Sequence, residues 1–202
     1  MAVDVVILAA GLSRRMGTCK ALLPWRQGTL LDVACEAYSQ LGGQRVVVAG
    51  QSVDELASIA SSHGYEIVFN DKASLGQGTS LACGIQALGT SSRAVLCAVV
   101  DQPLMTKEVV AQLVEAYELM PECAKSIICP LYGRDRQRGN PVIFGPDWKQ
   151  ALQRITADHG GREILQGIGK PYIRFVAIEE PVGVDVDTPF EYEQLYNMWG
   201  KL

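Results

Sequence analysis

The chain has 202 residues, of which 48% are hydrophobic and 20% are charged, and its formal net charge at pH 7 is −4. These values are typical of a folded globular protein and exclude a disordered chain. The length predicts a single domain, residues 1–202, with a sizeable hydrophobic core. The acidic balance argues against a broad surface for nucleic acid or for a membrane, so any anion site must be local.

The amino terminus lacks the basic leader of a secretory signal, and its apolar run is too short to span a bilayer. None of the six cysteines belongs to a Cys-x-x-Cys pair, so neither a zinc ribbon nor a thioredoxin motif is supported. We therefore expect a cytoplasmic protein whose thiols are reduced and mostly buried.

Strand-like and helix-like segments alternate along the chain. Several strand-like runs are apolar on both alternating faces, as are strands buried in a parallel sheet. The alternation predicts right-handed βαβ units and an α/β fold of three αβα layers, Rossmann-like, with a mixed but mostly parallel sheet. In chain order we expect strand 3–9, helix 30–41, strand 45–49, helix 53–62, strand 65–69, helix 79–88, strand 94–100, helix 107–120, strands 126–129 and 141–144, helix 146–155, strand 173–178 and helix 189–199.

Two of these helices begin with the spacing of a capping box, Ser52-x-x-Glu55 and Thr188-x-x-Glu191. Pro189 also stands where a first helical residue would be, a position that tolerates proline. Ligands of open parallel sheets bind beyond the carboxyl ends of the strands, where the strand order reverses. The loops after strands are therefore the expected place for a site.

The loop after the first strand carries three fixed positive charges, Arg14, Arg15 and Lys20. Gly11 and Gly17 allow positive φ angles and close approach of the backbone, whose N–H groups can surround phosphate oxygens. The loop has neither the Gly-x-Gly-x-x-Gly fingerprint of dinucleotide-binding proteins nor the Walker pattern. The residues therefore favour a phosphate site of another kind, and the alternative is a solvated basic turn.

The loop is part of a longer pattern that continues through most of the chain. The pattern resembles that of the MobA-like nucleotidyltransferases, and most closely that of the molybdenum cofactor cytidylyltransferases. The segments that carry the resemblance are LAAGLSRRMGTCK at 8–20, LLP at 22–24, GTLL at 28–31, GQGTSLACGI at 76–85, DQP at 101–103, RGNPVIF at 138–144, DHGGR at 158–162 and DVDTP at 185–189.

The resemblance implies a nucleotidyltransferase that moves CMP from CTP to a molybdopterin-type acceptor, with Mg²⁺ as cofactor and pyrophosphate as product. Ala10 supports CTP, because guanylyl-transferring relatives tend to have Gly-Gly where this chain has Ala10-Gly11. The implied partners are CTP, the acceptor and a client molybdoenzyme. Arg15, Lys20 and Asp101 are implied to be catalytic. The implied nucleotide-binding residues are Leu8, Ala9, Ala10, Gly11, Arg15, Gly17, Lys20, Gly76 and Ser80, and the implied substrate-binding residues are Gln77, Gly78, Thr79, Arg138 and Asn140.

Carboxylates form the second half of the expected site. Asp101 ends an apolar strand, where a carboxylate near bound phosphates is a reasonable Mg²⁺ ligand; a cap of the following turn is the alternative. Asp185 and Asp187 share one side of an extended segment and offer a second metal ligand. Asp185 is the stronger candidate because Asp187 can instead contribute to the start of the last helix, but the sequence leaves both open.

Two other functions stay open at this point. Cytidylyl or other nucleotidyl transfer to a sugar or polyol phosphate would use the same catalytic core. A non-catalytic nucleotide-binding partner of a molybdoenzyme would use the loop without turnover, although Asp101 and Asp185 argue against it. A Ser–His–Asp hydrolase is poorly supported, because neither His63 nor His159 accompanies a Gly-x-Ser-x-Gly elbow.

Overall fold

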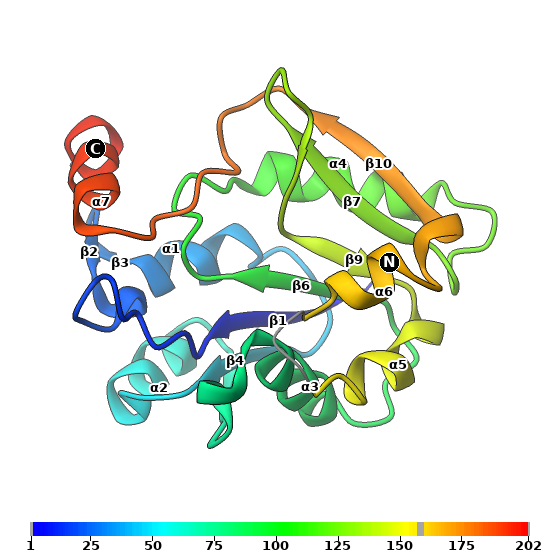
Figure 1. Cartoon of the computed structure of the whole chain (residues 1–202), viewed down its shortest axis with the longest axis horizontal. Helices are drawn as coiled ribbons and strands as arrows, with labels where there is room; N and C mark the ends of the chain where they lie inside the picture. Colours follow the sequence, from blue (N-terminus) through cyan, green and yellow to red (C-terminus); the bar gives the residue numbers. More distant parts are fainter. Residues whose placement is uncertain (1, 157–159, 202) are drawn as a thin grey trace.

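A computed structural model describes residues 2–156 and 160–201, with helices packed on both sides of a central sheet (Figure 1). The sheet has eight strands in the order β10-β7-β9-β6-β1-β4-β5, and β8 pairs with β7. Its pairings are parallel except those of β8 and β9, which run antiparallel to their partners. The strands are β1 (Asp4–Ala9), β4 (Arg45–Ala49), β5 (Glu66–Phe69), β6 (Val95–Val99), β7 (Ile127–Tyr132), β8 (Gln137–Arg138), β9 (Val142–Phe144) and β10 (Ile173–Ile178), with a separate hairpin of β2 (Pro24–Trp25) and β3 (Gly28–Thr29).

Two hydrophobic cores, one on each face of the sheet, confirm the predicted three layers. One core lies under α1 (Leu30–Ala37), α2 (Val53–Ser62) and α4 (Lys107–Glu118). The other lies under α3 (Gln77–Ala87), α5 (Lys149–Gln153) and α6 (Arg162–Gln166). The remaining helical pieces are the 3₁₀ turns Lys20–Leu22, Ala73–Leu75, Pro146–Trp148 and Lys170–Tyr172, the helix α7 (Pro189–Leu195) and the π-helical turn Tyr196–Gly200 that continues it.

The central strand β1 is buried on both faces, as its unbroken apolar run predicts. Val5 and Ile7 belong to the core under α1, and Val6 belongs to the core under α3. Gly84 of α3 lies so close to β1 that an added Cβ would overlap the side chains of Val6 and Val48. A glycine here lets α3 pack closely on the strand, and this packing positions the loop before α3 at the carboxyl end of β1.

The strand order reverses between β1 and β6. From β1 the chain moves outward through β4 to β5, and then returns to place β6 on the other side of β1. Because β1 and β6 are parallel neighbours, their carboxyl ends meet at one edge of the sheet. The loop at residues 10–20 and Asp101 after β6 therefore lie side by side, as the sequence predicts.

A capping-box sequence forms its hydrogen bonds only where the capping residue has a suitable backbone conformation. Thr188 and Glu191 form the expected capping box, with Pro189 as the first residue of α7. The capping box predicted at Ser52 is wrong: Ser52 has a left-handed backbone, φ +49°, and its side chain makes no capping hydrogen bond. A serine caps from an extended conformation, from which its oxygen can reach the free N–H groups. The sequence analysis also missed the capping box that Thr29 forms with Asp32.

A buried ion pair lies at the opposite edge of the sheet, where β1 begins. Asp4 is completely buried, and its Oδ2 lies 2.9 Å from Nζ of Lys149 and 2.6 Å from Oγ of Ser91. The backbone N–H of Gln44 donates to Asp4 Oδ1 at 3.0 Å. These contacts tie β1, the loop before β4 and α5 to one charged group, far along the strand from the carboxyl edge.

Within the described part of the chain, no helix combines the length and the apolar character that a membrane span requires. All six cysteines are free thiols. Four of them are buried, Cys19, Cys35, Cys97 and Cys129, and Cys83 and Cys123 are partly buried.

Candidate active site

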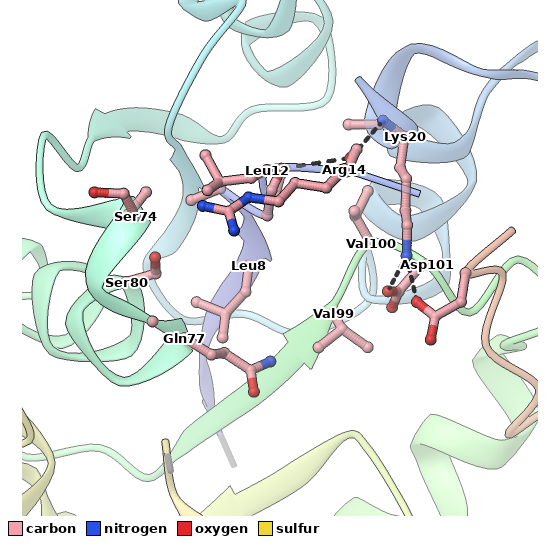
Figure 2. A pocket seen from close by; sticks show the side chains of 18 of the residues that line it. Leu8, Leu12, Arg14, Lys20, Ser74, Gln77, Ser80, Val99, Val100 and Asp101 are labelled. Carbon is pink, nitrogen blue, oxygen red and sulfur yellow. Dashed lines mark hydrogen bonds and ion pairs between the residues drawn. The ribbon is translucent and has the colours of Figure 1, made fainter. Parts of the chain in front are cut away.

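A cavity of about 450 Å³ opens at the carboxyl ends of β1 and β6 (Figure 2). The loop after β1 forms one wall, and the start of α3 with the 3₁₀ turn before it forms another. A cavity of this size suits a small-molecule ligand. It brings together most of the predicted nucleotide-binding residues, namely Leu8, Ala9, Ala10, Gly11, Arg15, Lys20, Gly76 and Ser80, with Gln77 and Asp101 beside them.

The loop after β1 is held by its own serine. The carbonyl oxygen of Ser13 accepts hydrogen bonds from the N–H groups of Met16 and Gly17, and Ser13 Oγ accepts one from the N–H of Lys20. Gly17 has the expected positive φ, +71°, but it does not line the cavity. At Gly11 the φ angle is not positive, and Ser13 takes the left-handed conformation instead, with φ +47°. A Cβ at Gly11 would meet nothing within 4 Å, so Gly11 leaves the cavity wall open to a ligand.

Two of the loop's cations contact carboxylates from distant parts of the chain. Lys20 Nζ lies 2.6 Å from Oδ1 of Asp187 and 3.2 Å from Oδ2 of Asp101. Arg15 Nη2 lies 2.8 Å from Oδ2 of Asp187. The Lys20 side chain is well covered, whereas that of Arg15 is 67% exposed. The predicted catalytic residues Arg15, Lys20 and Asp101 thus form one connected cluster through Asp187.

The segment that carries Asp185 and Asp187 belongs to no strand of the sheet and lies in the loop between β10 and α7. It is tied to the end of β6, because the N–H of Val186 donates to the carbonyl oxygen of Asp101 at 2.9 Å. Asp187 lines the cavity with Asp101, and Asp185 does not. Asp185 Oδ1 instead accepts a hydrogen bond of 2.9 Å from Nε2 of the buried Gln102.

The three carboxylates differ in how well their charge is compensated. Burial raises the pKa of Asp101 above its ordinary value, although Lys20 opposes the rise. Burial also raises the pKa of Asp185, and the negative charges of Asp101 and Asp187 raise it further. The hydrogen bond from Gln102 acts in the opposite direction and lowers it. The hydrogen bond from Lys20 lowers the pKa of Asp187. Asp101 and Asp185 are therefore the two carboxylates that an added cation would stabilise most.

These residues fit a magnesium ion that takes its other ligands from a substrate. Among the described residues, no cluster of three or more acidic, histidine or cysteine side chains is arranged to hold a metal by itself. Mg²⁺ is commonly bound by one or two carboxylates together with substrate phosphates and waters. Asp101 and Asp185 are two carboxylates of this kind, and Asp101 lines the cavity together with the loop after β1.

A second cavity of about 330 Å³ adjoins the first one and shares Leu8, Gln77 and Val99 with it. Arg138 and Asn140, predicted to bind the acceptor, line this cavity. Its other lining residues include Cys97, Cys129, Val142, Phe144, Gly160, Gly161 and Arg162. The guanidinium of Arg138 stacks over the ring of Phe175, 4.7 Å from its centroid.

Two predicted substrate-binding residues do not reach either cavity. Gly78 is buried within α3, and Thr79 donates its hydroxyl to the backbone oxygens of Lys72 and Gly76. Thr79 thereby holds the loop before α3, whose Gly76 and Gln77 do line the first cavity. Asp158 and His159 of the DHGGR segment lie outside the described residues.

Arg14, Gln102 and Arg162 are not among the predicted catalytic, binding or metal residues, although Arg14 is one of the three loop cations that favour a phosphate site. Arg14 lines the first cavity and Arg162 the second, and Gln102 holds Asp185. Each of them adjoins a residue that the sequence did single out: Arg15, Asp101 and the glycines of the DHGGR segment. The signals available in the sequence were the positive charge of Arg14 in the loop and the places of Gln102 and Arg162 within the DQP and DHGGR segments.

Comparisons with known proteins agree with this geometry. Residues 5–172 match the family model described as the MobA-like NTP transferase domain. The chain is 32% identical to the nicotine blue oxidoreductase of Paenarthrobacter nicotinovorans, covering 96% of this chain and 94% of that one. It is 29% identical to the molybdenum cofactor cytidylyltransferase of Escherichia coli K12, covering 95% and 94%. A crystal structure of the Rv0371c homologue from Mycobacterium sp. strain JC1 superposes with a TM-score of 0.81, at 29% identity over 97% and 96% of the two chains.

The fold, together with a cavity lined by the cationic loop after β1 and by the carboxylate that follows β6, defines a nucleotidyltransferase. This chain belongs to the MobA-like NTP transferase family, as its sequence motifs predict.

Proposed function

We propose that the protein transfers CMP from CTP to a molybdopterin-type acceptor and releases pyrophosphate. The observation that supports this proposal is that the two cavities adjoin each other and share the lining residues Leu8, Gln77 and Val99. A donor in the first cavity and an acceptor in the second would meet at these residues. The similarity to the molybdenum cofactor cytidylyltransferase of E. coli supports this choice of acceptor and donor.

The reaction is an in-line displacement at the α-phosphorus of the donor. An oxygen of the acceptor's terminal phosphate forms the new P–O bond, and the bond to the pyrophosphate leaving group breaks. No covalent intermediate with the protein is required, so the protein contributes alignment and charge compensation. Arg15 and Lys20 would contact oxygens of the triphosphate, where their charges stabilise the leaving pyrophosphate.

Asp101 and Asp185 would hold Mg²⁺ at the edge of the sheet. A bound Mg²⁺ would supply positive charge to the phosphate oxygens. Gln102 donates to one oxygen of Asp185 and leaves its other oxygen without a hydrogen bond among the described residues. Asp187 then serves mainly as the partner of Arg15 and Lys20, since both of its oxygens contact these cations.

The wall of the first cavity supports CTP as the donor. Ala10 is buried and lines this wall. Its methyl group leaves less room than the glycine that guanylyl-transferring relatives tend to have at this position, which favours the smaller pyrimidine base of CTP.

The test is pyrophosphate release with each of the four nucleoside triphosphates, in the presence and absence of Mo-molybdopterin and with Mg²⁺ or EDTA. We expect release only with CTP, acceptor and Mg²⁺ together. Release with a sugar or polyol phosphate in place of molybdopterin would favour that alternative acceptor class. Tight binding of CTP without turnover under every condition would instead indicate a non-catalytic nucleotide-binding partner.

A second candidate is oxidoreduction, supported by the 32% identity to the protein named nicotine blue oxidoreductase. The absence of the Gly-x-Gly-x-x-Gly fingerprint after β1 counts against a dinucleotide in the first cavity. Calorimetric titration with NADH and NADPH tests this candidate, and we expect no binding that competes with CTP.

A further inference from the structure

In the described part of the chain, Arg14 of the first cavity forms no ion pair with a carboxylate. The cavity is lined by three cations, Arg14, Arg15 and Lys20, and by two carboxylates, Asp101 and Asp187. Arg15 and Lys20 contact these two carboxylates. For Arg14, no ion pair or side-chain hydrogen bond is found within residues 2–156 and 160–201.

Arg14 also points in a different direction from Lys20. Figure 2 shows the Arg14 side chain extending across the cavity toward the wall that carries Ser74 and Ser80, whereas Lys20 reaches down to Asp101 on the other side. The wall that Arg14 faces is lined by Ala73, Ser74, Gly76, Gln77 and Ser80, and among the described lining residues on this wall none is acidic. A guanidinium that faces an uncharged wall can bind an anion that enters between the two.

The positive charge of Arg14 stands out because the chain as a whole is negatively charged. With a net charge of −4, the surface as a whole repels a triphosphate. A cation in the cavity wall that has no carboxylate partner among the described residues attracts the anion to this point, and the attraction weakens as salt screens it.

We propose that Arg14 is the capture residue for the donor, an additional binding group that contacts the triphosphate of the entering nucleotide. This inference rests on the proposed function and deepens it. Arg14 binds before Arg15 and Lys20 exchange their carboxylate partners for phosphate oxygens. Its contribution is to affinity and to the rate of association, and the displacement at phosphorus does not depend on it.

The experiment compares Arg14→Gln and Arg14→Lys with the matched control Arg154→Gln. Arg154 is an exposed arginine at the end of α5 and lines neither cavity, so its replacement changes the net charge equally. Inorganic tripolyphosphate is titrated calorimetrically in EDTA at low and at physiological salt. We expect Arg14→Gln to lower the affinity about tenfold at low salt and less at higher salt. Arg14→Lys should keep most of the affinity, and Arg154→Gln should match the wild type.

Steady-state kinetics separates this proposal from the proposed function. With CTP, acceptor and Mg²⁺, Arg14→Gln should raise KM for CTP about tenfold and leave kcat unchanged, as expected when uniform binding is lost. A wild-type KM and wild-type tripolyphosphate affinity in Arg14→Gln would overturn the role of Arg14 while the nucleotidyl transfer stands. If the wild type releases no pyrophosphate but Arg14→Gln still loses tripolyphosphate affinity, the proposed function fails and the anion site stands.

Discussion

Both carboxylate oxygens of Asp187 contact cations of the loop after β1: Oδ1 lies 2.6 Å from Lys20 Nζ, and Oδ2 lies 2.8 Å from Arg15 Nη2. The backbone N–H of Asp187 is in turn bound by the Glu191 side chain at the start of α7. A carboxylate that bridges two cations in this way binds the same N–H groups that phosphate oxygens of a ligand would need. A triphosphate must therefore compete with Asp187 for Arg15 and Lys20.

We predict that Asp187→Asn increases the affinity for a metal-free triphosphate. The amide keeps the size of the side chain but removes the charge that competes for Arg15 and Lys20. The gain should be about tenfold, the effect of one charge-assisted contact released to the ligand. Titration calorimetry with CTP in EDTA measures it.

Asp185→Asn is the control for that experiment, because Asp185 contacts Gln102 and neither of the two cations. It should leave metal-free CTP affinity close to that of the wild type while weakening binding of Mg²⁺ in the presence of CTP. Weaker metal-free binding in Asp187→Asn would show that Asp187 orients the cations and does not compete for them.

Asp101→Ala should abolish Mg²⁺-dependent pyrophosphate release while the chain stays folded. The change removes one of the two carboxylates proposed to hold the ion, and we expect turnover to fall at least about a hundredfold. Lys20 retains Asp187 as its partner, so no buried cation is left alone. Pyrophosphate release and the circular dichroism spectrum are measured together, and turnover at the wild-type level would exclude Asp101 as a metal ligand.

Arg15→Ala should mainly weaken triphosphate binding. The guanidinium suits phosphate oxygens, and the loss of one such contact costs about 2 kcal/mol of binding free energy. Stability should change little, because the ion pair with Asp187 is largely exposed on the Arg15 side. Calorimetry with CTP and Mg²⁺ gives the affinity, thermal unfolding gives the control, and an unchanged affinity would count against the assignment.

Asp4→Asn should lower the free energy of unfolding by about 3 kcal/mol, because it leaves the buried Lys149 ammonium without its counter-charge. Burial raises the pKa of Asp4, but the hydrogen bonds from Ser91, Lys149 and Gln44 outweigh it and hold the pKa below the ordinary value of 3.8. The stabilisation from Asp4 is therefore complete above that value and is lost as the pH falls through the lower, folded-state pKa.

Urea unfolding of wild type and Asp4→Asn from neutral pH down to about pH 3 tests both parts of the Asp4 prediction. The wild type should lose more stability than the variant across the acid range, so the two curves should converge at low pH. A constant difference between them would show that Asp4 does not titrate with unfolding.

The sequence by itself determined the layers of the fold and which loops meet at the carboxyl edge of the sheet. The apolar run of β1 is hydrophobic on both faces, and a strand with that pattern must be covered by helices on both sides. The capping box of Thr188 with Glu191 was also readable, because its two residues are three positions apart in the chain. Such signals depend only on residues close together in the sequence, so they can be recognised without knowing how the helices pack on the sheet.

The tertiary structure alone decided which charges are paired. Lys20 and Asp187 are 167 positions apart, and Lys20 and Asp101 are 81 apart, so no local pattern could assign these partners. The same holds for the hydrogen bond from Gln102 to Asp185, and for Arg14, which has no carboxylate partner among residues 2–156 and 160–201. The conformation of Ser52 was also beyond the sequence, since its left-handed backbone prevents the capping that its neighbours suggest. The physical reason is that ion pairing and burial depend on distances in space, which the packing of helices on the sheet sets.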